Sequence, residues 1–374
     1  MTIIAPTQEL SGSSAPAKKL EIVQAFRGIA SIGVLLTHCS VIFQDQLGRP
    51  FLSNIFAFGG AGVDFFFVLS GFIIFYIHEK DINKPDRFKS FLLKRLSRVY
   101  PLYWFVVAVK LISSWGLKGF DLSEVNLSWD FLSSIALLPQ KQELLILGVS
   151  WTLSFEIFFY LVFGLAILFP RQVVLPMIGA WFVGCAAHLF GLFSIARGTL
   201  LADFWLSPLN LEFAMGCYSA YLLRRHRFSS GQALLCGGIF LLTLSIVTDI
   251  YTATHGLPSL TKSISVVTYG IPFWLLLMGA ITLEFSKPIK VSPLLGEIGN
   301  ASYSIYLMHG FFLNHLLKVL AKISVSLQYR SLQYNVFLTS GVALVICGLA
   351  VLLCYCVYYW IEKPILEFCR KAIA

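Results

Sequence analysis

The sequence predicts an all-α, polytopic membrane protein: a helical bundle of about ten transmembrane helices with both termini in the cytoplasm. Two properties of the composition predict this class. Hydrophobic residues make up 57% of the 374-residue chain and charged residues only 13%, and the mean hydropathy is +0.78. A soluble domain needs a larger charged surface, whereas a chain surrounded by lipid does not. The third observation is the length of the apolar runs, many of which approach the roughly 20 residues that a helix needs to cross a bilayer.

The apolar runs follow a polar start. Residues 1–20 are rich in Ser, Ala, Pro and Thr, lack the apolar core of a signal peptide and predict a disordered cytoplasmic tail. The first two spans are expected at 22–41 and 55–77, and a strongly charged loop, 79–98, then leads to a third span at 100–115. Further along we expect an interfacial segment at 131–138 and spans at 151–169, 173–194, 205–223, 231–251, 263–284, 298–320 and 335–361.

Lys and Arg are distributed unevenly between the loops. They cluster in alternate segments, whereas the intervening loops hold few. Because cytoplasmic loops carry such an excess, both chain ends are expected inside. The same orientation explains the net charge of +9, so the expected partner is the lipid bilayer and no nucleic acid. We expect one transmembrane domain, 21–367, between the tails 1–20 and 368–374.

Several common signatures are missing. The eight cysteines form no CxxC pair and lie almost wholly in apolar spans, which is typical of small core residues. Neither a disulfide nor a metal site is therefore expected. No P-loop or dinucleotide-binding glycine motif occurs, which argues against nucleotide hydrolysis and hydride transfer.

The first span carries two ionisable residues. Arg27 is near its inner end and His38 is near its outer end. Eleven residues correspond to about 16 Å and nearly three whole turns, so both side chains share one helix face. Ionisable groups within a span face a protein interior or a water-filled cavity and mark functional sites. A snorkelling Arg and a His bound to a backbone carbonyl would explain them equally well.

Glu156 is a candidate partner for His38. It lies about five residues below the outer end of its span, or roughly 7 Å deep, which is similar to the depth expected for His38. A carboxylate beside an imidazole fixes its tautomer and makes it a better general base. We therefore predict a catalytic His38–Glu156 pair, although Glu156 alternatively binds another buried polar group.

Arg95 and Arg98 form a second candidate site at the inner face. Their spacing of three residues places both guanidinium groups on one side of a helical turn. Such fork-shaped donors suit phosphate oxygens. Taken alone, basic residues at this place are better explained as anchors of the topology.

The remaining intramembrane polar residues are candidates for lining the site. Asp64 lies within the second span, where it would pair with Arg27, line the path or form a structural ion pair. Tyr303, Tyr306 and His309 share one stripe of the ninth span. They fit an acceptor cavity, and they fit a hydrogen-bonded core stripe equally well.

Six motifs occur in order along the chain: FRGIASIGVLLTH, GVDFFFVLSGFII, LKRLSRVYPLYW, SWTLSFEIFFY, IGNASYSIYLMH and YYWIEKP. Together they resemble, over about residues 20–367, the acyltransferase family 3 membrane transacylases. The resemblance matches Arg27 and His38 to the family's paired Arg and His, and Ser70-Gly71-Phe72 to its SGF motif. It also matches Arg95 and Arg98 to its RxxR motif and Glu156 to the acidic position of its fourth-helix motif.

The resemblance implies a membrane O-acyltransferase of the bacterial cytoplasmic (inner) membrane. Acetyl-CoA or another acyl-CoA would be the co-substrate, with Arg27, Arg95 and Arg98 on the donor side. The acceptor would be a hydroxyl of an extracytoplasmic or lipid-linked carbohydrate, such as an exopolysaccharide or O-antigen. His38 would act as general base or as a covalent acyl relay. Homo-oligomers or polysaccharide-assembly partners are compatible with this function.

Two alternatives remain at this stage. A polytopic transporter of a glycolipid or small solute would use the buried Arg, His, Asp and Glu as substrate or proton sites. No clear internal repeat supports a transporter fold. A different family of membrane acyltransferases would also use an intramembrane His, but the RxxR segment would then lack an explanation.

Overall fold

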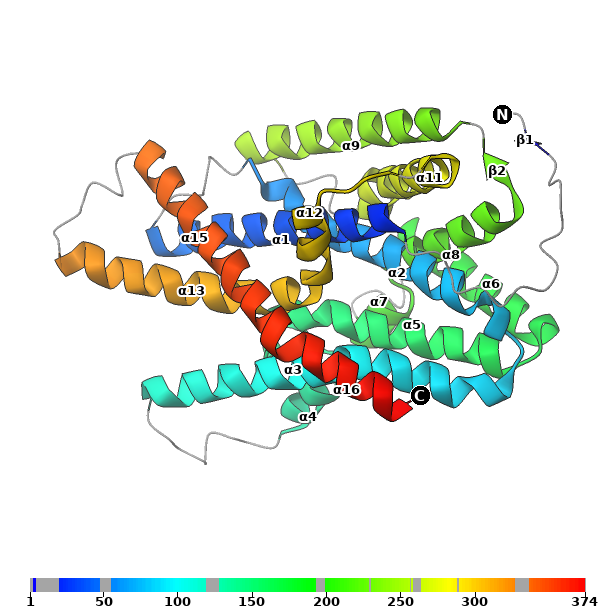
Figure 1. Ribbon diagram of the computed structural model, residues 1–374, viewed down its shortest axis with the longest axis horizontal. Helices are drawn as coiled ribbons and strands as arrows, with labels where there is room; N and C mark the ends of the chain where they lie inside the picture. The colour runs from blue at the N-terminus through cyan, green and yellow to red at the C-terminus, as the bar shows by residue number, and fades with distance from the viewer. Residues whose placement is uncertain are drawn as a thin grey trace.

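The computed structural model describes residues 3–4, 20–47, 55–118, 128–192, 199–228, 230–255, 257, 264–287, 289–326 and 336–373. It confirms the all-α class (Figure 1). The α-helices are α1 (Glu21–Leu47), α2 (Gly62–His78), α3 (Phe88–Lys118), α4 (Trp129–Ala136), α5 (Trp151–Leu168), α6 (Arg171–Leu189), α7 (Leu200–Trp205), α8 (Leu209–Arg225), α9 (Gly231–Thr254), α11 (Ile271–Ser286), α12 (Pro293–Asn300), α13 (Ser302–Ser326), α15 (Val336–Val357) and α16 (Lys363–Ile373). Two π-helical segments, η9 (Val266–Gly270) and η10 (Tyr358–Glu362), precede α11 and α16.

Short elements complete the described chain. The 3₁₀ segments are η2 (Ala57–Ala61), η3 (Glu79–Asp81), η4 (Pro85–Arg87), η6 (Gln142–Leu144) and η7 (Gly148–Ser150). Two-residue strands, β1 (Ile3–Ile4) and β2 (Arg227–Phe228), pair antiparallel. The interfacial segment expected at 131–138 corresponds to the short helix α4.

Eight helical segments in the described part of the chain are long and apolar enough to cross a membrane. They coincide with eight of the expected spans. The other two expected spans fall on α8 and α13. At 17 residues, α8 is short and buries Asn210 and Glu212, and α13 carries two histidines and an asparagine. The total of ten spans therefore stays a prediction.

The third span differs from the expectation in one important respect. The segment 88–98 is the start of α3 rather than a loop, and the helix continues through Pro101. Proline removes one backbone hydrogen bond and usually breaks a helix in water, but packing in a membrane protein tolerates it. Because α3 begins at Phe88, Arg95 and Arg98 lie two to three turns inside the helix. Only 7% of Arg95 is exposed.

Helix α1 occupies the centre of the bundle. It contacts α2, α11, α12, α13 and α15, and in Figure 1 it runs through the middle of the molecule between α9 and α3. Buried residues of α1 and α2 belong to both hydrophobic clusters of the core. One cluster extends into α3, α5, α13 and α15, and the other extends into α8 and α11. The face of α1 that carries Arg27 and His38 is therefore surrounded by protein.

Helices α2 and α8 approach each other closely through two glycines. A Cβ added at Gly71 would lie 2.0 Å from the carbonyl oxygen of Phe213, and one added at Gly216 would lie 1.9 Å from that of Val68. Small residues permit such close approach of membrane helices, which stabilises their packing. The middle residue of the SGF motif thus has a packing role that any side chain would disrupt.

This contact predicts a large stability difference between glycine variants. Gly216→Ala should lower the thermal midpoint in detergent or prevent folding, because the obstacle is backbone and overpacking costs about 1–3 kcal/mol or more. Gly237→Ala is the matched control, since its added Cβ meets no atom within 4 Å. Equal melting of the two variants in fluorescence-detected size-exclusion measurements would contradict the close packing of α2 and α8.

The orientation can be tested at two exposed positions. The C-terminal end of α1 and the N-terminal end of α3 lie at opposite ends of the bundle (Figure 1). Gln46 is in the last turn of α1, and Asp86 lies two residues before α3. In a cysteine-depleted background, Gln46→Cys should react with a membrane-impermeant thiol reagent on intact cells, and Asp86→Cys only after permeabilisation. Labelling of both positions from the same side would refute the predicted topology.

Candidate active site

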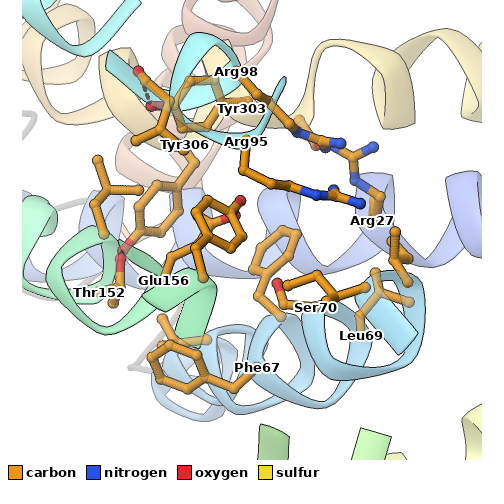
Figure 2. Close-up of a pocket in the computed structure, with 18 residues that line it drawn as sticks. Arg27, Phe67, Leu69, Ser70, Arg95, Arg98, Thr152, Glu156, Tyr303 and Tyr306 are labelled. Atoms are coloured by element: carbon orange, nitrogen blue, oxygen red, sulfur yellow. Dashed lines mark hydrogen bonds between the residues drawn. The ribbon is translucent and has the colours of Figure 1, made fainter. Parts of the chain in front are cut away.

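A cavity opens inside the bundle between α1, α2, α3, α5 and α13 (Figure 2). It holds about 830 Å³ of empty space, including the part that is open to solvent. Its walls are largely apolar, and its lining residues are Arg27, Val63, Phe66, Phe67, Leu69, Ser70, Ile73, Ile74, Arg95, Arg98, Val99, Thr152, Leu153, Glu156, Tyr160, Ser302, Tyr303 and Tyr306. Seven of the residues singled out from the sequence are in this set, so the structure brings together side chains from five helices.

Three guanidinium groups gather at one side of the cavity. Arg27 comes from α1, and Arg95 and Arg98 come from consecutive turns of α3 (Figure 2). None of the ion pairs within 4 Å among the described residues includes any of the three. The buried Nε of Arg95 has no hydrogen-bond partner there. Positive charge inside a membrane protein is costly unless an anion or water balances it, so this end of the cavity is suited to an anionic ligand.

Glu156 lies between the arginine end and the rest of the cavity. Its Oε1 accepts a hydrogen bond from the hydroxyl of Tyr160, one turn further along α5. The Tyr160 ring in turn faces Arg95, whose Cζ is 6.0 Å from the ring centroid. Glu156 also acts electrostatically on Arg27 and Arg95. Glu156 therefore interacts with the arginines, both directly through its charge and through Tyr160.

The opposite end of the cavity is closed by a hydrogen-bonded pair. The hydroxyl groups of Thr152 and Tyr306 are 2.7 Å apart, and the Tyr306 hydroxyl also donates to the carbonyl oxygen of Val149 at 2.9 Å. Figure 2 shows this pair on the side away from the guanidinium groups. The cavity is therefore polarised, with cations at one end and hydroxyl groups at the other.

The two histidines of the predicted site lie just beyond Tyr306. The ring centroids of Tyr306 and His309 are 6.3 Å apart, and those of His309 and His38 are 4.8 Å apart in an edge-to-face arrangement. His38 is partly exposed, whereas His309 is fully buried. The Nδ1 atom of His38 is 2.9 Å from the carbonyl oxygen of Val34. Because a carbonyl can only accept, Nδ1 carries the proton and Nε2 is free to act as a base.

The sequence predicted a direct contact between His38 and Glu156. In the structure, His38 contacts the Val34 carbonyl and His309 instead, and Glu156 accepts a hydrogen bond from Tyr160. Thr152 is level with Tyr306, and Glu156 lies four residues deeper along α5. His38 is level with His309, which lies three residues beyond Tyr306 in the opposite direction. At 1.5 Å per residue, the two groups are separated by roughly 10 Å along the bundle. The sequence does not give this separation, because the relative register of α1 and α5 cannot be read from their lengths.

Asp64 also differs from its expected place. It is not among the residues that line the cavity. It is buried instead beside the carboxyl group of Glu212 in α8 and the side chain of Ser265. Asp64 therefore belongs to the packing between α2, α8 and η9 rather than to the arginine cluster. Ser70, Tyr303 and Tyr306 line the cavity.

Sequence reasoning missed one carboxylate near the arginines. Glu362 is 5% exposed, accepts a hydrogen bond from the hydroxyl of Ser304 at 2.5 Å and acts electrostatically on Arg27 and Arg98. The π-helical turn of η10 carries it, and such turns are common at functional sites. A carboxylate at the end of the last apolar run of the sequence was the available signal.

The arrangement combines three chemical properties. The arginine end can bind phosphate or another anion, the apolar walls can hold an extended acyl-bearing chain, and a partly exposed imidazole with a free Nε2 can remove a proton. Among the described residues, no group of three or more His, Cys, Asp or Glu side chains is placed to hold a metal ion.

Comparisons with known proteins identify several similar chains. The exopolysaccharide production protein ExoZ of Rhizobium meliloti (strain 1021) is 29% identical over 268 residues, which cover 70% of this chain and 79% of ExoZ. The acyltransferase MdmB of Streptomyces mycarofaciens is 28% identical, over 55% of this chain and 58% of MdmB. An O-acetyl transferase of Shigella phage Sf6 is 26% identical, over 52% of this chain and 60% of that protein. No solved structure matches the chain significantly.

The family model described as an acyltransferase domain, Acyl_transf_3, matches residues 21–359. This match extends from the first residue of α1 into η10 and includes the cavity and both histidines. The alternative of a transporter without catalysis is thereby set aside. The chain belongs to the Acyl_transf_3 acyltransferase family and is a multi-pass membrane acyltransferase.

Proposed function

We propose that this acyltransferase moves an acetyl or other short acyl group from cytoplasmic acyl-CoA to a hydroxyl of an extracytoplasmic or lipid-linked carbohydrate. The observation that carries the proposal is the polarised cavity, with three arginines at one end and His38 beyond the other. The names of two relatives support a glycan acceptor, since they refer to exopolysaccharide production and O-acetyl transfer. Such a reaction belongs in the bacterial cytoplasmic membrane.

The donor would enter from the arginine end. Arg95 and Arg98 offer forks of donors that suit phosphate oxygens, and the phosphates of acyl-CoA supply the missing negative charge. The apolar walls, which include Val63, Phe66 and Leu153, would hold the extended arm. The thioester would then reach the Thr152–Tyr306 end. This direction agrees with the predicted orientation of α1, in which Arg27 is nearer the cytoplasm than His38.

The chemical step would take place beyond Tyr306. The Nε2 atom of His38 removes the proton of the acceptor hydroxyl, and the oxygen attacks the thioester carbonyl. The bond to sulfur breaks, the thiolate of CoA leaves, and the proton held by the imidazole neutralises it. The hydrogen bond between Nδ1 and the Val34 carbonyl keeps the ring in the required tautomer throughout.

The first test of this function concerns His38. His38→Ala should lower acyl transfer at least about 10²-fold, because positioned general bases typically contribute 10²- to 10⁴-fold. Glu156→Gln should cost less, since its contacts are with Tyr160 and the arginines. The measurement is the O-acetyl content of the surface polysaccharide in a gene-deletion strain that expresses each variant at equal membrane level.

His315→Ala is the matched control for His38. His315 also anchors Nδ1 on a backbone carbonyl, at 2.8 Å, but its Nε2 is 3.1 Å from the hydroxyl of Ser113. The His315→Ala variant should therefore retain most of the acyl-transfer activity. Near-normal acetylation by a well-expressed His38→Ala variant would rule out the proposed role of His38.

The second test concerns the donor. Arg95→Lys and Arg98→Lys should each raise the KM for acetyl-CoA several-fold while leaving the KM for the acceptor unchanged. A lysine retains the charge but cannot form two parallel hydrogen bonds to one phosphate. Release of CoA by purified protein in nanodiscs provides the measurement. Full activity with lysine at both positions would show that these residues only anchor the topology.

A further inference from the structure

The contact between His38 and His309 is built symmetrically. Each ring places Nδ1 at 2.9 Å from the carbonyl oxygen four residues earlier in its own helix, Val34 in α1 and Ile305 in α13. Both Nδ1 atoms therefore carry a proton, and both Nε2 atoms hold a free electron pair in the neutral state. The rings meet at a centroid distance of 4.8 Å and an interplanar angle of 60°.

The Nε2 atom of His309 has no hydrogen-bond partner among the described residues, although its side chain is fully buried. Buried polar atoms are normally paired, and an exception calls for an explanation. Two neutral imidazoles with bare Nε2 atoms have no proton to share between them. A single added proton changes this, because a protonated ring becomes a donor and a cation that the neighbouring ring can stabilise.

Few other titratable groups face the pair. On α13 itself, Tyr306 lies 6.3 Å from His309 between ring centroids. Beside His38 on α1, the thiol of Cys39 contacts that of Cys347 from α15. Glu156 of α5 acts on Tyr306, and the depth difference derived above separates it from His38. In the described part of the chain, His309 is thus the ionisable side chain in ring contact with His38.

We propose that His309 is the positioning residue of the catalytic base: it holds the ring of His38 and stabilises the imidazolium that forms when His38 removes the acceptor proton. This inference rests on the proposed function. The role usually filled by a carboxylate passes to a neutral imidazole, which adds no negative charge to the interior of the membrane. His309 is fully buried and is not among the residues that line the cavity, so its role is to position His38.

The proton balance of the step is complete with this pair. The acceptor O–H bond breaks, its proton goes to Nε2 of His38, and its electron pair forms the new C–O bond to the acyl carbon. The C–S bond of the thioester breaks, and its electron pair leaves with the CoA sulfur. His309 interacts with the positive charge while His38 holds the proton. The proton then moves to the thiolate, and both imidazoles return to the neutral state.

The test compares two phenylalanine variants of α13. His309→Phe keeps an aromatic ring beside His38 but removes both nitrogens, and His315→Phe is the matched control on the same helix. Acyl transfer is measured in nanodiscs between pH 5 and 9, with acetyl-CoA as donor and the polysaccharide from a gene-deletion strain as acceptor. We expect His309→Phe to lower kcat about 10- to 100-fold, with the KM for acetyl-CoA within about twofold. The acid limb of its kcat/KM profile should move to lower pH, because His309 no longer stabilises the protonated form of His38.

A second variant guards against a folding defect. The carboxamide of His309→Gln can accept a hydrogen bond but cannot be protonated, so it should recover part of the kcat lost in His309→Phe. An unchanged pH profile and kcat in a well-folded His309→Phe variant would overturn the proposal. A rise in the KM for acetyl-CoA without a change in the pH profile would also overturn it. Failure of the proposed function is distinguishable, since the wild-type protein would then release no CoA or the His38→Ala variant would remain active.

Discussion

The structure depends on the cost of placing positive charge inside a membrane bundle. Arg27, Arg95 and Arg98 share one cavity and form no ion pair within 4 Å in the described part of the chain. Such groups are tolerated only where protein dipoles, water or a bound anion replace the solvent that they have lost. Helix α1 must therefore be central, since a lipid-facing position would expose Arg27 to hydrocarbon. The packing of five other helices around α1 follows from the same requirement.

Packing and chemistry meet within the SGF motif of α2. Gly71 lets α2 approach the backbone of α8, and the same turn directs Ser70 into the cavity while Phe72 is buried. A side chain at position 71 would separate the two helices and move Ser70 relative to Arg27. Conversely, the cavity stays open because α2 is held on its far side by α8. The packing of this interface therefore positions one wall of the site.

The sequence was sufficient for the fold class and for the arginine end of the site. The polar residues within apolar runs, and the spacing of Arg95 and Arg98, identified side chains that do converge. The sequence could not predict the relative register of the helices. Glu156 and His38 seemed to lie at equal depth, but α5 is placed so that Thr152, rather than Glu156, meets Tyr306. The start of α3 at Phe88 was also missed, because Pro101 and a charged segment resemble a loop boundary when neighbours are unknown.

In the proposed reaction, the distribution of charge along the bundle separates donor binding from proton transfer. Two carboxylates, Glu156 and Glu362, act electrostatically on the arginines of the cavity. In the proposed reaction, these two carboxylates would temper the positive charge, so that the donor is released after transfer. His38 is paired instead with a neutral ring at the other end. A carboxylate beside His38 would bind the proton more firmly and slow its return to the leaving thiolate. In this proposal the two carboxylates adjust donor binding by the arginines, and the imidazole of His309 supports proton transfer by His38.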